Sequence, residues 1–177
     1  MMMSMLESGG IAAVTDGSRR PDKDNPKGYY ELEKVKEIQQ DISWLEDCHG
    51  KAVKIVSNLL FYLPDNHKYK IIFMRRHMKE VLASQQTMLS RLERHGARKR
   101  SELMAESFSK HITRVEKWLK VKHYDVLPID YRDVIIDPRK NSENISKFLN
   151  IRLNIAKMVA VVDSSLYRNR GDGEKKA

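Results

Sequence analysis

Four short apolar runs alternate with longer stretches of helical periodicity, and this alternation narrows the folds open to the chain. The runs lie at residues 11–15, 51–57, 69–75 and 124–131. Between the first two runs, apolar residues recur at helical spacing and predict an amphipathic helix over 31–46. Strands that alternate with helices favour an α/β domain with a mostly parallel sheet covered on both faces. Ligands of such sheets bind beyond the carboxyl ends of the strands, where Ser57 and Arg76 lie.

Length, charge and cysteine count limit the class of protein. The length of 177 residues suits one domain with a substantial core. A net charge of +9 predicts an anionic partner: nucleic acid, a phosphorylated or sulfated ligand, or an anionic surface. The single cysteine, Cys48, excludes an internal disulfide and fits a reducing compartment, so we expect a cytoplasmic protein. The apolar stretch at residues 1–10 is interrupted by Glu7 and is too short for a signal peptide or a membrane span.

The histidines do not predict a metal site. There are six of them, His49 and His67 included, scattered without ligand-like spacing and without a CxxC pair. We therefore expect no structural zinc site and no metal cofactor.

Arg76 and Ser84 are the first candidates for a binding site. Arg76 leaves the third apolar run at the ligand edge, and Ser84 lies in the helix predicted to follow. A guanidinium offers a planar fork of donors to a phosphate or an oxyanion, and a hydroxyl can complete the same pocket. Alternatively, Arg76 pairs with a carboxylate, and the small side chain of Ser84 lets helix and strand approach closely. The spacing of these residues alone favours this alternative. Strand alternation turns Arg75 to the opposite side, where we expect a structural role.

Two segments resemble motifs of the sulfotransferase family. RHMKEVLAS, residues 76–84, is similar to the Arg-x-x-x-(Asp/Glu)-x-(Leu/Val)-x-Ser segment. In that family this segment binds the 3′-phosphate of the sulfuryl donor, 3′-phosphoadenosine-5′-phosphosulfate (PAPS). IDYRDVIIDPRKNSENISKFLNI, residues 129–151, is similar to the family's Tyr-Glu-Asp-Leu…Asp-Pro…Phe-Leu-Gly signature, with Arg132 in place of the usual acid and Asn150 in place of the glycine.

The resemblance implies a donor site residue by residue. Arg76 and Ser84 match the two ligands of the 3′-phosphate. LYRNRGDG, near the end of the chain, is similar to the family's Arg-Lys-Gly, which folds over the same phosphate; it would make Arg168, Arg170 and Gly171 donor-binding residues. A solvated basic tail is the alternative for this last segment.

A third segment, KIVSNLLFYLP, resembles the family's Lys-x-His…Leu-Pro segment near the acceptor. The lysine, Lys54, is kept, but Val56 occupies the histidine position, so this match does not identify the general base. The resemblance makes Lys54 and Ser57 candidate catalytic residues. Lys54 would stabilise the leaving oxygen. Ser57 or Asn58 would orient an acceptor, but neither is basic enough to take its proton alone. Alternatively, Lys54 is a strand lysine whose stem packs on apolar surface.

The family's phosphate loop, which cradles the 5′-phosphosulfate between a first strand and a first helix, has no counterpart in the sequence. MMMSMLESGG, with Gly9 and Gly10 as a helix stop, resembles the helix that follows this loop. We therefore expect an N-terminally truncated form of one three-layer domain with the P-loop NTPase-like fold, over residues 1–167. A flexible basic tail would follow at 168–177.

The resemblance implies an enzyme that transfers a sulfuryl group from PAPS to a hydroxyl or an amine without a metal. The acceptor would be a small molecule, a carbohydrate or a peptide, and the missing loop leaves the activity of this chain open. A nucleotide or small-molecule kinase is the alternative, which should carry a GxxxxGK[ST] loop and prefer ATP. A basic nucleic-acid-binding module ranks third, because only 7% of the residues are aromatic.

Overall fold

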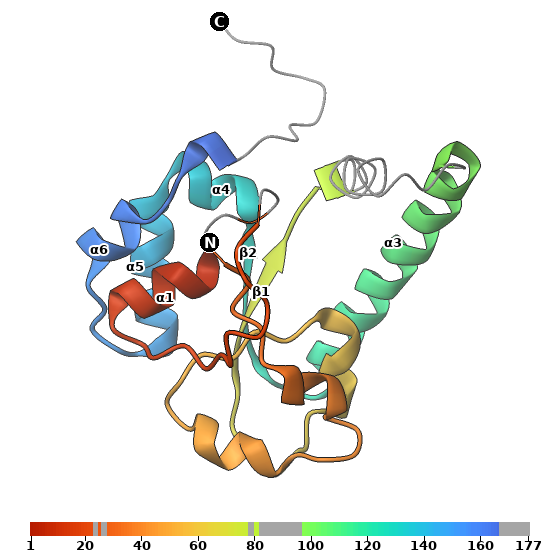
Figure 1. The fold of residues 1–177 in the computed structure, drawn as a ribbon, viewed down its shortest axis with the longest axis horizontal. Coiled ribbons are helices and arrows are strands. Elements are labelled where there is room, and N and C mark those ends of the chain that lie inside the picture. Colours follow the sequence, from red (N-terminus) through yellow and green to blue (C-terminus); the bar gives the residue numbers. More distant parts are fainter. Residues whose placement is uncertain (23–24, 26–27, 78–79, 82–96, 167–177) are drawn as a thin grey trace, which may run out of the picture.

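The fold is α/β, with a small parallel sheet between groups of helices (Figure 1). The computed structural model describes residues 1–22, 25, 28–77, 80–81 and 97–166. The α-helices are α1 (Met2–Gly9), α3 (Ala97–Val121), α4 (Tyr131–Ile136), α5 (Pro138–Leu149) and α6 (Ile155–Ala160). The 3₁₀-helices are η1 (Glu33–Glu37), η2 (Ser43–Cys48), η3 (Ser57–Tyr62) and η4 (Ser164–Leu166), and the strands are β1 (Lys70–Arg75) and β2 (Asp125–Asp130).

The two strands pair in parallel, in register from Lys70 opposite Asp125 to Arg75 opposite Asp130. The prediction of strands at 69–75 and 124–131 in a parallel sheet is therefore confirmed. Since the strands run the same way, the residues that follow Arg75 and Asp130 emerge at one edge of the sheet. The ligand edge expected from the sequence is the edge at which these two strands end.

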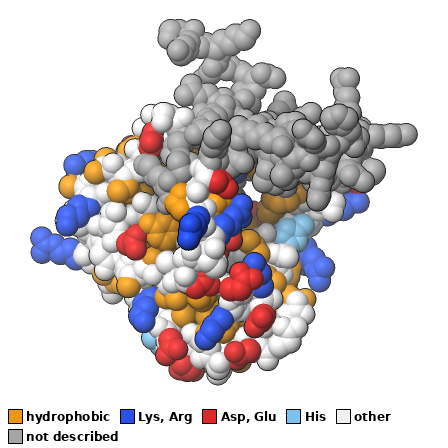
Figure 2. Space-filling model, in the orientation of Figure 1, with side chains coloured by type: hydrophobic (Ala, Val, Ile, Leu, Met, Phe, Trp, Pro, Cys, Tyr) orange, Lys and Arg blue, Asp and Glu red, His pale blue; other side chains and the backbone are white. Residues whose placement is uncertain are grey.

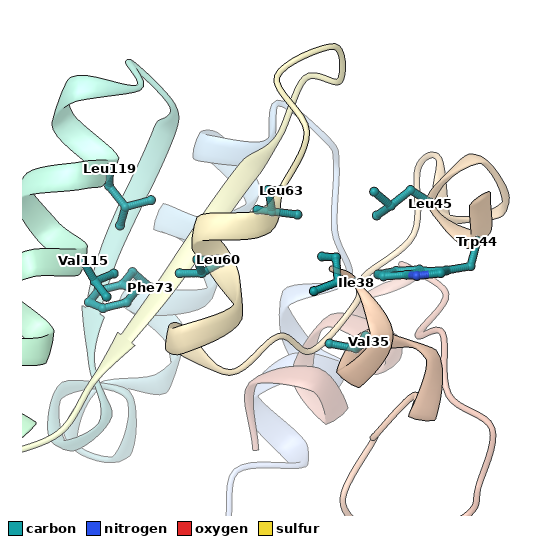
Figure 3. Packing of buried hydrophobic residues seen from close by; sticks show 9 residues of the cluster. All are labelled: Val35, Ile38, Trp44, Leu45, Leu60, Leu63, Phe73, Val115 and Leu119. Carbon is teal, nitrogen blue, oxygen red and sulfur yellow. The ribbon is translucent and has the colours of Figure 1, made fainter. Parts of the chain in front are cut away.

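Side chains of the sheet enter two separate apolar clusters, one on each face. One cluster lies between β1, η3, α3 and the segment of η1 and η2, as Figure 3 shows; it consists of Val35, Ile38, Trp44, Leu45, Leu60, Leu63, Phe73, Val115 and Leu119. The other joins β2 to α1, α4, α5 and α6; it consists of Met5, Leu6, Ile129, Val134, Ile145, Leu153 and Met158. In β1, Phe73 points to the first cluster and its neighbours Ile72 and Met74 to the second, as strand alternation requires.

The strands predicted at 11–15 and 51–57 are reduced to a single contact. Among the described residues they meet as one isolated parallel bridge between Ala13 and Ala52. Two hydrogen bonds support it: Val14 N–H donates to the carbonyl of Ala52 at 2.9 Å, and Ala52 N–H to that of Ala12 at 2.8 Å. The apolar pattern correctly predicted that side chains of the second run contact the core, since Val53 and Ile55 pack on the first cluster. Burial alone does not create a strand, because a ladder also needs a backbone partner along its length.

The single helix predicted over 31–46 is wrong: two short 3₁₀-helices, η1 and η2, replace it. Asp41 lies in the break between them. Its carboxylate accepts from Ser43 N–H at 2.8 Å and its carbonyl from the indole N–H of Trp44 at 3.0 Å. A short acidic side chain that captures nearby donors competes with helical hydrogen bonding and ends the helix. Ile42, counted in the predicted apolar stripe, is 41% exposed as a result.

The amino-terminal helix α1 ends as its glycines predict. Gly10 adopts φ 110°, a left-handed conformation, and Ile11 N–H donates to the carbonyl of Leu6 at 2.9 Å. The preceding residue, Gly9, lies against α6: its carbonyl accepts from Asn154 N–H at 3.0 Å. A Cβ on Gly9 would lie 2.9 Å from both Cγ and Sδ of Met158, which is fully buried. The missing side chain allows α1 and α6 to pack closely.

We expect Gly9→Ala to destabilise the fold by about 1–3 kcal/mol, because the added methyl group overpacks a filled core. Denaturant unfolding of Gly9→Ala, Met158→Ala and the double variant would measure it. Met158→Ala removes both opposing atoms, so the cost of Gly9→Ala should largely disappear in that background. An equal cost in both backgrounds would contradict the close approach.

Candidate functional site

The carboxyl edge of the sheet gathers charged and aromatic side chains from both strands. Arg75, the last residue of β1, donates from Nη2 to Oδ2 of Asp130, the last residue of β2, at 3.0 Å. The two side chains are 42% and 46% exposed, so the pair lies at the surface and ties the strand ends together. The structural role expected of Arg75 fits this ion pair.

Arg76 lies between the start of the next helical segment and the end of β2. Its Nε donates to Oε2 of Glu80 at 3.2 Å, and its guanidinium carbon lies 5.0 Å from the centroid of the Tyr131 ring. The Glu80 side chain is only 6% exposed and that of Arg76 28%. Burial raises the pKa of Tyr131, and the positive charge of Arg76 opposes this effect. The guanidinium is thus held by an acid on one side and an aromatic ring on the other.

The carboxylate partner that the sequence analysis raised as an alternative for Arg76 is present, and it is Glu80. This contact is compatible with anion binding, because a guanidinium carries five donors and the bond from Nε to Glu80 uses one of them. A nearly buried carboxylate also fixes the direction in which the remaining donors point. Glu80 is therefore a residue that orients Arg76, and sequence spacing alone assigned it no role.

Lys54 is turned toward the loop formed by residues 28–32. Its Nζ donates to the carbonyl of Tyr29 at 2.9 Å and lies 3.4 Å from Oε1 of Glu31. Arg19 approaches the same segment, with its Nη1 3.3 Å from Oε1 of Glu31. The Lys54 side chain is 35% exposed. In this arrangement Lys54 anchors the loop, and its role toward a ligand stays a prediction.

Ser57 forms a pair that the sequence analysis missed. Its Oγ lies 2.9 Å from Nε2 of His111, a residue of α3 that is 54 positions away in the chain. Both side chains are half-buried. The His111 ring also meets the rings of Phe61 and Phe108, with centroids 6.2 and 6.4 Å away. A hydroxyl held against an imidazole that apolar rings surround can pass a proton to it.

A signal for His111 was available in the sequence. It lies three residues after Phe108 and four before Val115, which places it on the apolar face of the helix. A histidine there faces the interior, where Ser57 is its hydrogen-bond partner. The position aligned with the family's histidine holds Val56, which is 53% exposed.

The predicted site residues are only partly brought together. Lys54 contacts the segment at 29–31, Ser57 contacts α3, and Arg76 contacts Glu80. Among the described residues, no hydrogen bond or ion pair of the structure joins two of these three. The other predicted donor ligands lie outside the described residues; they are Ser84, Arg168, Arg170 and Gly171.

Two of the histidines that are scattered in the sequence come together in the fold. The fold brings His49 and His67 together with Glu46, near enough for the three side chains to hold a metal ion. The spacing in the sequence did not indicate this, because residues 46–49 and 67 belong to different segments.

Charges of both signs cover the face of the molecule drawn in Figure 2. Among the described residues on that face, Lys and Arg side chains interleave with Asp and Glu. A nucleic-acid backbone binds best to a continuous basic surface. On this face the Lys and Arg side chains of the described residues do not gather into such a surface.

Comparison with known proteins identifies the family. The profile of the sulfotransferase domain matches residues 55–172, about two thirds of the chain. The match includes Ser57, Arg76 and His111, and it begins just after Lys54. The chain belongs to the sulfotransferase family. The searches of curated proteins and of solved structures found no match.

The helices of the described part differ from membrane-spanning helices in length or in composition. None of those in the described part of the chain combines the length and the apolar character needed to cross one.

Proposed function

We propose that this chain is a sulfotransferase that binds PAPS and takes part in transferring its sulfuryl group to a hydroxyl or an amine. The observation that carries the proposal is the position of Arg76. It follows the last residue of β1, at the edge where parallel sheets bind ligands, and it lies inside the region that matches the family. The acceptor would be a small molecule, a carbohydrate or a peptide.

The proposed fold is a three-layer domain of the P-loop NTPase-like type, over residues 1–167. Its support is the parallel pairing of β1 with β2 and the apolar clusters on both faces of that sheet. The single cysteine supports a cytoplasmic location.

On the donor side, Arg76 would hold the 3′-phosphate through donors that Glu80 does not occupy. A bidentate contact from a guanidinium suits a phosphate, and the nearly buried Glu80 would keep the fork aimed at the ligand edge. Ser84 would add a hydroxyl donor to the same phosphate. In this proposal Arg168, Arg170 and Gly171 would close over it.

On the acceptor side, Ser57 and His111 would relay a proton. As the acceptor oxygen or nitrogen bonds to sulfur, the bond from sulfur to the bridging oxygen of the 5′-phosphate breaks. The electron pair of that bond leaves with adenosine 3′,5′-bisphosphate. Ser57 Oγ would receive the acceptor's proton and pass its own to Nε2 of His111, across the observed 2.9 Å. Lys54 would stabilise charge on the leaving oxygen once released from Tyr29.

Calorimetric titration of the full chain with adenosine 3′,5′-bisphosphate, compared with ADP, tests the proposal. We expect the 3′-phosphorylated nucleotide to bind more tightly, because only it offers the phosphate that Arg76 and Ser84 would hold. Equal or tighter binding of ADP would favour a kinase-like function. If a chain that is shown to be folded binds neither nucleotide, that result would contradict the proposed donor site.

A further inference from the structure

Two histidines and one glutamate converge at the amino end of β1. Nε2 of His49 lies 3.4 Å from Oε2 of Glu46, and Nε2 of His67 lies 3.7 Å from Oε1 of the same carboxylate. The two imidazole centroids are 5.7 Å apart, with the rings edge to face. One ligand atom from each of the three residues can be chosen so that all lie within 4.8 Å of one another.

The backbone presents these side chains from anchored segments. Glu46 belongs to η2, and His49 is the residue that caps it. Residues three apart on a 3₁₀-helix eclipse one another, so both side chains leave the same face. Trp44 and Leu45 hold η2 in place, since they are only 3% and 7% exposed. His67 belongs to the segment that precedes β1, and its side chain is 13% exposed.

The spacing fits the coordination sphere of zinc. Zinc bonds of about 2.0–2.2 Å to nitrogen and oxygen give a tetrahedron with edges of roughly 3.3–3.5 Å. The imidazoles lie 3.4 and 3.7 Å from different oxygens of the carboxylate, and one ligand atom from each residue lies within 4.8 Å of the others. Exposed side chains need to draw together by about an ångström to reach the tetrahedral edges. We propose that Glu46, His49 and His67 bind a divalent transition-metal ion, zinc in the first place, with water as the fourth ligand.

The choice of ion follows from the donor atoms. Two imidazoles and one carboxylate suit zinc, copper or nickel, whereas magnesium and calcium require mostly oxygen ligands. The competing interpretation is a surface carboxylate that only forms ion pairs with protonated histidines and does not bind a metal ion. Metal titration distinguishes the two interpretations, because only a metal site takes up an ion.

The site is separate from the proposed sulfuryl transfer. His67 comes before Lys70, where β1 begins, whereas Arg76 follows the other end of that strand (Figure 1). The bound ion would connect η2 to the segment that leads into β1. Since an ion that binds only the folded chain stabilises it by mass action, the melting temperature should rise with metal concentration.

The test uses the full chain without a histidine tag, stripped of metal with a chelator. We expect calorimetry to give one zinc ion per chain, and cobalt to produce the absorption bands of a tetrahedral site. His49→Ala and Glu46→Gln should each weaken zinc binding by roughly tenfold or more, because each removes one of three protein ligands. Both side chains are about 70% exposed, so the fold should tolerate these changes.

His77→Ala is the matched control, because His77 is exposed and lies outside the cluster. It should leave zinc affinity unchanged. Less than one ion per chain would overturn the assignment, as would binding that survives both His49→Ala and Glu46→Gln. An equal loss in His77→Ala would show that the histidines bind zinc without forming a defined site, which also overturns it.

Discussion

Binding of adenosine 3′,5′-bisphosphate is expected to weaken by roughly a hundredfold or more when Arg76 is replaced by alanine. Hydrogen bonds between a guanidinium and a phosphate are charge-assisted, and the loss of a bidentate contact costs about 3 kcal/mol. Titration calorimetry of Arg76→Ala against the wild-type chain would measure the change. Arg75→Ala is the matched control: the neighbouring arginine pairs with Asp130 and should leave nucleotide affinity nearly unchanged.

The variant has a second effect that the experiment must separate from binding. Arg76→Ala deprives Glu80 of this partner, and the Glu80 side chain is only 6% exposed. Leaving a buried charge with fewer partners destabilises a fold. We therefore expect Arg76→Ala/Glu80→Gln to regain thermal stability without regaining nucleotide affinity. Affinity that returns with stability would mean that Arg76 supports the fold and does not contact the phosphate.

Replacing His111 by alanine is expected to slow sulfuryl transfer by about 10²–10⁴-fold, the usual contribution of a general base. The measurement is the rate of transfer from PAPS to a hydroxyl acceptor, with nucleotide affinity determined in parallel. Affinity should not change, because the proposed donor site lies at the end of β1 and not on α3. Added imidazole should restore part of the rate.

Ser57→Ala provides an independent check of the relay. If Ser57 passes its proton to His111, the two residues act as one unit, so the double variant should be hardly slower than His111→Ala alone. Lys110→Ala, an exposed change on the same helix, controls for effects on α3 itself. Fully additive losses, or a rate in His111→Ala close to that of wild type, would exclude the relay.

The elements predicted well are those whose signals are local. Short apolar runs predicted β1 and β2, and paired glycines predicted the end of α1, since both patterns depend on adjacent residues. The prediction failed over 31–46. There the apolar spacing was helical, but Asp41 bonds to Ser43 and interrupts the helix. Periodicity reports which side chains are buried and not which hydrogen bonds the backbone makes.

The sequence predicted single residues of the candidate site but not the contacts between them. A strand end locates Arg76, because the direction of parallel strands fixes the ligand edge. The pairing of Ser57 with His111, and of His49 with His67, depends on how distant segments pack. A sequence without an alignment carries almost no direct record of such contacts. His111 could be recognised by its place on the apolar face of a helix, but its partner could not be named.

The packing of α1 against α6 has a consequence for synthesis on the ribosome. Met5 is fully buried in a cluster whose other buried members, apart from Leu6 of the same helix, come from residues 129–158. At about 5–20 residues per second, the apolar face of α1 emerges roughly 8–30 s before Met158 is made. During that interval the cluster is incomplete, so the helix lacks part of its native packing and is open to chaperones. Helix α1 is therefore synthesised well before most of the residues that bury it.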